Sequence, residues 1–120
     1  MAKRLARQRG TAHPKKERIV RHYLKQWRKR RGLTQDQLAE RVERTRGLIA
    51  QYESGQTEMP ESMIYALAHA LAIDTWDLFK TNPEKEGELV DITDELRGLD
   101  EKERSEALGY IRAMKARKAS

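Results

Sequence analysis

The 120-residue chain contains no cysteine. Without cysteine, neither a disulfide framework nor a cysteine-based zinc site can form. The sequence also lacks an apolar run approaching the roughly 18 residues that span a membrane, and its first residues lack the apolar segment of a signal peptide. These absences predict a cytoplasmic protein with one compact domain and tails, no membrane contact and, from its 38% hydrophobic content, a small core.

Patterns that carry catalysis or hold metals are also missing. The three histidines, His13, His22 and His69, have a spacing that fits no metal motif. No glycine-rich phosphate loop is present, and the acidic residues are spread along the faces of predicted helices. We therefore expect no enzymatic activity, no cofactor and no metal.

The positive charge is concentrated at the N-terminus. Residues 1–31 contain 13 Lys or Arg and one acidic residue, whereas residues 32–82 carry a net charge of −4 and residues 83–120 one of −2. This asymmetry favours a polyanionic partner, although a solvated tail has the same composition. Because Gly10 and Pro14 interrupt any long helix, we expect residues 1–16 to form a basic arm.

The remaining apolar residues recur at intervals of three and four, which predicts an all-α fold. A first helix is expected over residues 17–31, with Ile19 and Val20 in its apolar stripe, and Gly32 ends it. Capping signals at Thr34 with Gln37, and at Thr45, begin the next two helices, and Gly55 ends the second of these. Further helices are expected over residues 60–71 and 75–79, the latter contributing Trp76, Leu78 and Phe79 to the core.

The C-terminal part is expected to be simpler. Residues 81–99 read as a linker that contains a short strand or a helical turn. Asp100 and Glu103 then form a capping pattern for a last helix within residues 100–120. The apolar face of this helix is narrow, so it is a candidate dimerisation element.

The most specific pattern runs from Arg28 to Gly55. Two helices that cross closely need a small residue at the contact, which Ala39 supplies, and Ile49 is placed to pack against it. The second helix then presents Arg46, Gly47 and Gln51 outward. A projecting helix of this kind can enter the major groove of DNA.

The order of residues extends this pattern to residue 79. It comprises Gly32-Leu33-Thr34-Gln35, Leu38-Ala39, Thr45, Ile49, Glu53, Gly55, Pro60, Leu67, Ala70-Leu71 and Trp76-Asp77-Leu78. In this combination the chain resembles the lambda-repressor-like (Xre-family, Cro/repressor-type) helix-turn-helix domain. The resemblance implies a five-helix DNA-binding domain over residues 17–80, with the helix-turn-helix at 35–54 and the recognition helix at 45–53.

The resemblance also implies roles for single residues. Arg46, Gly47 and Gln51 would face base edges, and Arg46 leads because a bidentate Arg–guanine contact is the commonest specific one. For Gly47, a tolerated surface glycine is an equal alternative. Phosphate contacts or positioning would fall to Thr34, Gln35, Arg44, Thr45 and Thr57. Arg28 and Glu53 match a structural ion pair, and Ala39 and Ile49 are structural.

Four residues depart from the family pattern. Glu43 stands where the turn often has glycine, Arg44 replaces the usual apolar or small turn residue, and Glu58 and Glu61 stand where basic residues are common. Because affinity for DNA depends mainly on phosphate neutralisation, the negative domain needs basic residues from elsewhere. We expect them in the arm: Lys3, Arg4, Arg7, Arg9, Lys15 and Lys16.

These observations predict a sequence-specific transcriptional regulator. The simplest form is a repressor that binds double-stranded DNA at a palindromic operator as a homodimer and associates with the nucleoid. The alternative is an antitoxin with the same domain, which would bind a toxin protein through residues 89–118. An adaptor that binds protein in place of DNA is a third alternative.

Overall fold

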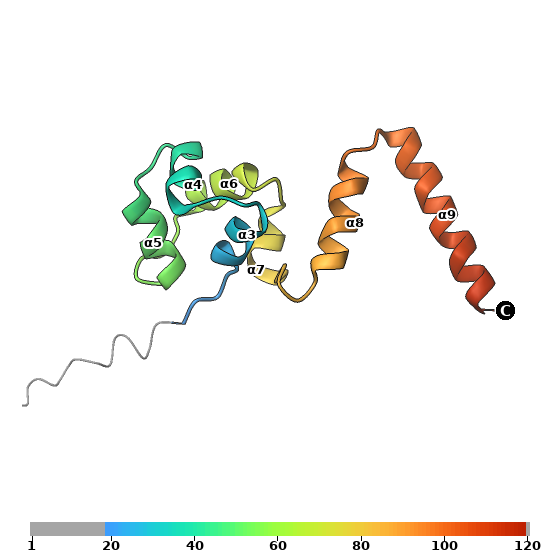
Figure 1. Ribbon diagram of the computed structural model, residues 1–120, viewed down its shortest axis with the longest axis horizontal. Helices are drawn as coiled ribbons and strands as arrows, with labels where there is room; N and C mark the ends of the chain where they lie inside the picture. The colour runs from blue at the N-terminus through green and yellow to red at the C-terminus, as the bar shows by residue number, and fades with distance from the viewer. Residues whose placement is uncertain (1–18, 120) are drawn as a thin grey trace, which may run out of the picture. The chain divides into compact units, whose positions relative to one another are not determined.

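The computed structural model describes residues 19–119, which fall into two units with their boundary between Lys85 and Glu86. Within the described residues the chain is all-helical, which confirms the predicted class (Figure 1). The first unit contains α3 (Leu24–Arg30), α4 (Gln35–Arg41), α5 (Arg46–Ser54), α6 (Glu61–Ala70) and α7 (Thr75–Lys80). The second contains α8 (Gly87–Arg97) and α9 (Glu101–Ala119).

The core of the first unit draws on all five of its helices. Its least exposed side chains are Leu24, Trp27, Leu38, Ile49, Leu67, Leu71 and Leu78. Trp27 is buried with its polar atom satisfied, because Nε1 donates to the carbonyl oxygens of Asp77 and Thr81, both at 3.0 Å. This indole therefore joins α3 to both ends of the last turn of α7.

Helix α3 begins later than the sequence predicted. It starts at Leu24, and residues 19–23 are not helical, so Ile19 and Val20 are exposed and not part of a buried stripe. The Tyr23 amide donates to the carbonyl of Leu78 at 2.8 Å, a contact across the fold that replaces a helical hydrogen bond. The ring of His22 then accepts from the amide of Leu24 through Nδ1 at 3.3 Å.

The starts of α4 and α5 are fixed by the predicted caps. Thr34 Oγ1 accepts from the Gln37 amide at 3.0 Å, and the Thr34 amide donates to Gln37 Oε1 at 2.8 Å, which confirms the capping box. Thr45 Oγ1 accepts from the amide of Leu48 at 3.2 Å.

Four helices of this unit end in the same way, with one residue in the left-handed conformation. At the ends of α3 and α5 this residue is Gly32 or Gly55, as predicted, with φ of 71° and 79°. At the ends of α4 and α6 it is Glu43 or Ala72, with φ of 56° and 58°. Each end closes with the backbone hydrogen bond of a Schellman motif, for example from the amide of Arg44 to the carbonyl of Ala39 at 2.9 Å.

Trp76 does not belong to the core, contrary to the prediction from the sequence. It was expected to be buried with Leu78 and Phe79, yet it is 66% exposed, while Leu78 is fully buried and Phe79 partly so. The reason is helical geometry, since residues two apart point about 200° apart around a helix. Lys80 Nζ lies 5.6 Å from the ring centroid of Trp76 and covers it in part.

In the second unit, residues 87–97 form the helix α8, where a short strand or helical turn within a linker was expected. Asp100 and Glu103 form the predicted cap of α9: the Asp100 amide donates to Glu103 Oε1 at 3.0 Å, and the Glu103 amide donates to Asp100 Oδ1 at 2.8 Å. No helix within residues 19–119 has both the length and the apolar character needed to cross a bilayer.

Candidate nucleic-acid interface

The candidate interface is built on α4 and α5, which pack against each other and are joined by residues 42–45 (Figure 1). Ala39 on α4 and Ile49 on α5 are both almost fully buried. Leu38 on α4 and Tyr52 on α5 are also buried, on the same sides of their helices as Ala39 and Ile49. Since one face of α5 is held in the core, its opposite face is fixed in an outward orientation.

That outward face begins at the N-terminal end of α5. Arg46 and Gly47, its first two residues, are exposed, and Ala50 and Gln51 one turn later are half-buried. A Cβ atom added at Gly47 would have no atom within 4 Å, so the surface is open at this point. The three residues predicted to face base edges are therefore all at least partly accessible.

A buried polar network holds α5 to the rest of the unit. Arg28 Nε and Nη2 donate to the two carboxylate oxygens of Glu53 at 2.6 and 3.2 Å, and Arg28 Nη1 donates to the Leu33 carbonyl at 2.8 Å. The side chains of this ion pair are 10% and 5% exposed. A bidentate pair of this geometry fixes orientation as well as distance, so it sets the angle of α5 against α3.

Gln35 extends this network from α4. Its Nε2 donates to Glu53 Oε1 at 3.1 Å, so the first residue of α4 is tied to the last turn of α5. The side chain is half-buried. Gln35 therefore braces α5, which is one of the two roles predicted for it, while its phosphate contact stays a prediction.

The loop after α5 is also joined to the outward face. Thr57 Oγ1 donates to Gln51 Oε1 at 3.1 Å, and the Thr57 amide donates to the Gln51 carbonyl at 3.3 Å. These contacts orient the Gln51 amide and bring the loop beside it. The sequence patterns did not predict this pairing, because nothing in their periodicity links a helical residue to the following loop.

The charges around this surface are mixed. Arg44 and Arg46 are exposed, but so are Glu43 and Glu58. Arg44 Nη1 donates to the carbonyl of Glu43 at 2.9 Å, which holds its side chain next to the turn. The hydroxyls of Thr34 and Thr45 are used as helix caps. The described surface therefore brings little net positive charge of its own.

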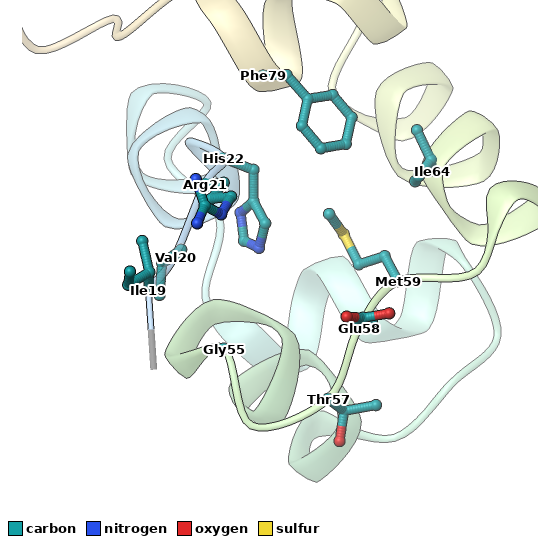
Figure 2. Close-up of a pocket in the computed structure, with 10 residues that line it drawn as sticks. All are labelled: Ile19, Val20, Arg21, His22, Gly55, Thr57, Glu58, Met59, Ile64 and Phe79. Atoms are coloured by element: carbon teal, nitrogen blue, oxygen red, sulfur yellow. The ribbon is translucent and has the colours of Figure 1, made fainter. Parts of the chain in front are cut away.

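A hollow of about 450 Å³ lies beside the loop that follows α5 (Figure 2). Ile19 and Val20, the first described residues, line it together with Thr57, Glu58 and Met59. The chain thus enters the unit next to the loop that follows α5. The predicted arm residues Lys3, Arg4, Arg7, Arg9, Lys15 and Lys16 lie outside the described residues.

His22 lines the same hollow, and sequence reasoning gave it no role. Its Nε2 lies 3.1 Å from the Tyr52 carbonyl, while its Nδ1 accepts from Leu24, so the ring links α3 to α5. The ring of Phe79 lies edge-on to it at a centroid distance of 6.3 Å (Figure 2). Burial lowers the pKa of His22, against smaller opposing effects of the Tyr52 carbonyl and the Glu53 charge. The neutral ring is therefore the form that fits this site.

Comparison with protein families agrees with this geometry. Residues 19–77 match the family model described as a helix-turn-helix domain. The chain contains a helix-turn-helix domain. Comparisons with curated proteins and with solved structures find no match.

The limits of the matched helix-turn-helix segment correspond to structural features. It begins with the first described residues, includes α3, α4, α5 and α6, and ends within α7. The unit formed by α8 and α9 lies beyond it. Within residues 19–119, no group of three or more His, Asp or Glu side chains could hold a metal ion.

Proposed function

We propose that the chain is a sequence-specific DNA-binding transcriptional regulator of the lambda-repressor-like (Xre) type, and that it acts as a repressor. The observation that carries this proposal is the outward face of α5, where Arg46 and Gly47 are exposed on a helix whose other face is locked by the Arg28–Glu53 pair. In helix-turn-helix proteins, the N-terminal residues of the recognition helix contact base edges. Arg46 stands first in α5 and is suited to a bidentate contact with guanine.

The regulator is proposed to act as a dimer. One small helix-turn-helix unit reaches few base pairs, and two-fold symmetric dimers read two half-sites about one helical turn apart. A repressor of this kind would occupy its operator and block polymerase. Residues 89–118 are the segment available for contact with a second protein chain.

The basic arm is proposed to supply most of the attraction to DNA. Residues 1–31 carry all of the positive excess, and the chain enters the domain beside the loop that follows α5. Affinity that comes from phosphate neutralisation falls steeply as the salt concentration rises, and the slope is proportional to the number of phosphate contacts. Deletion of residues 2–16 should therefore weaken binding to any DNA and flatten the salt dependence. Unchanged affinity and an unchanged slope would refute this role.

Selection of bound duplexes from a random pool tests the proposed function. The full chain should enrich a palindromic motif whose half-sites are centred about 10–10.5 base pairs apart. The selected site should bind at least about 1,000-fold more tightly than random DNA at the same salt concentration. Enrichment of no motif, with salt-sensitive binding to every sequence, would show a non-specific polyanion binder in place of a regulator.

A further inference from the structure

Helix α9 carries an apolar stripe that its own unit leaves partly exposed. The helix has 19 residues, and none of them is buried. Ala107, Ile111 and Met114 are separated by four and three residues, with Leu108 next to them, so they lie along one side of the helix. Leu108 is 44% and Met114 42% exposed. Intervals of this kind are typical of a helix that packs along another helix.

The charged residues of α9 are distributed unevenly along its length. Glu101, Glu103 and Glu106 lie in its first six residues together with Lys102 and Arg104, whereas the residues after 106 include no acidic side chain and four basic ones, Arg112, Lys115, Arg117 and Lys118. Residues seven apart lie on the same side of a helix. Glu101 and Lys115 therefore border the stripe on the side of Leu108, and Glu103 and Arg117 border it on the side of Tyr110.

We propose that α9 pairs with α9 of a second copy of this chain in antiparallel orientation. In this arrangement Leu108 meets Leu108 of the second copy, Ile111 lies beside Ala107, and Glu101 lies opposite Lys115 of the second copy. Glu103 is placed in the same way opposite Arg117. Each charge pair occurs twice because the two copies are related by a two-fold axis. The inference rests on the dimer in the proposed function and adds the surface and orientation by which it forms.

Charge favours this orientation over the parallel one. Parallel pairing would place Arg104 beside Arg104 of the second copy in the seam between the helices. Residues that flank a parallel seam pair with an offset of five, so Glu103 would meet Leu108 and Tyr110 would meet Lys115. No opposite charges would be paired. The antiparallel arrangement places acidic residues of each copy opposite basic residues of the other.

Two charge reversals test the orientation. The variants Glu101→Lys and Lys115→Glu each convert both copies of one attractive pair into a repulsive one, and each should weaken self-association about 10-fold or more in sedimentation equilibrium. When the two variants are mixed, every such pair in the mixed dimer again joins opposite charges. The mixture should therefore recover the association of the unmodified chain, and mass spectrometry should show the mixed dimer in excess over both homodimers.

Matched controls use charges on the outer side of α9. Glu106→Lys and Arg112→Glu make the same changes in net charge away from the stripe and should leave association within about twofold, since exposed charges that face solvent contribute little. Any one of three results would overturn the inference. The unmodified chain could be monomeric, the single variants could dimerise as strongly as the unmodified chain, or the mixture of the two variants could fail to regain the association of the unmodified chain. Duplex selection tests the proposed function separately. If the chain is a monomer that enriches a single half-site, DNA recognition is supported and the α9 pairing is refuted.

Discussion

Gly47 is the residue at which stability and DNA recognition should separate. It is the second residue of α5 and is exposed. Because a Cβ atom at this position would meet nothing within 4 Å, an alanine fits without moving a neighbour. Glycine in a helix is less favourable than alanine by about 0.5–1 kcal/mol, so Gly47→Ala should stabilise the domain by about that amount. For a domain of this size the melting temperature should rise by roughly 2–8 °C.

The same substitution should weaken DNA binding. If the backbone of α5 approaches the base edges at Gly47, an added methyl group occupies the space that the DNA needs. The expected loss is of the order of one mismatched base pair, about 1–3 kcal/mol. Thermal unfolding monitored by circular dichroism measures the first effect, and titration of a single half-site duplex at constant salt measures the second.

Gly109→Ala is the matched control for this experiment. Gly109 lies in α9, and a Cβ atom there also meets nothing within 4 Å, so the change in helix propensity is the same. It should leave the affinity for a half-site unchanged. If Gly47→Ala raises stability and the affinity also stays unchanged, Gly47 is a tolerated surface glycine and the proposed close approach to DNA is wrong.

Three further predictions concern the scaffold. Replacing Glu53 with Gln leaves the Arg28 charge buried without its counter-charge, so urea denaturation should show a loss of about 3–5 kcal/mol; a loss below about 1 kcal/mol would contradict the role of the pair. Glu43→Gly removes a left-handed non-glycine residue and should stabilise the fold by about 0.5–1 kcal/mol, as should Ala72→Gly at the end of α6. If both variants destabilise the fold, the strain proposed at these turns is refuted. Because burial lowers the pKa of His22, the unfolded chain takes up this proton first, so stability should be constant above about pH 6.5 and fall as the pH drops below it. His22→Gln should flatten that fall, and an unchanged profile would assign it to other groups.

Features determined by neighbouring residues could be predicted from the sequence. The box of Thr34 and Gln37 uses side chains that reach amides three residues away, and Gly32 and Gly55 mark ends at which left-handed backbone costs least. Ala72 adopts the same conformation without any such signal. The contacts of the surrounding fold impose it there.

Features determined by distant contacts could not be predicted. The start of α3 coincides with the hydrogen bond from the Tyr23 amide to the Leu78 carbonyl, which joins residues far apart in the chain. The sequence carries no sign of this contact, so the apolar spacing of Ile19 and Val20 predicted a longer helix. Exposure of Trp76 likewise depends on which side of α7 meets the core. Periodicity identified the apolar residues of α7, but a helix of six residues is too short for it to decide which of them are buried.

The candidate site shows the same division. Helical spacing alone indicated that Arg46 and Gly47 face away from the core, because Ile49 and Tyr52 must face toward it. The ion pair of Arg28 with Glu53 joins residues far apart in the chain and was expected only from the resemblance to a known family. The contact between Gln51 and Thr57 had no sequence signal at all.

The central claim is that α5 reads base sequence through Arg46. Duplex selection with the unmodified chain and with Arg46→Ala, at the same salt concentration, tests it most directly. The variant should lose its preference at one base pair of each half-site, at a cost of about 1–3 kcal/mol, and keep the rest of the motif. An unchanged motif with unchanged affinity would contradict the claim.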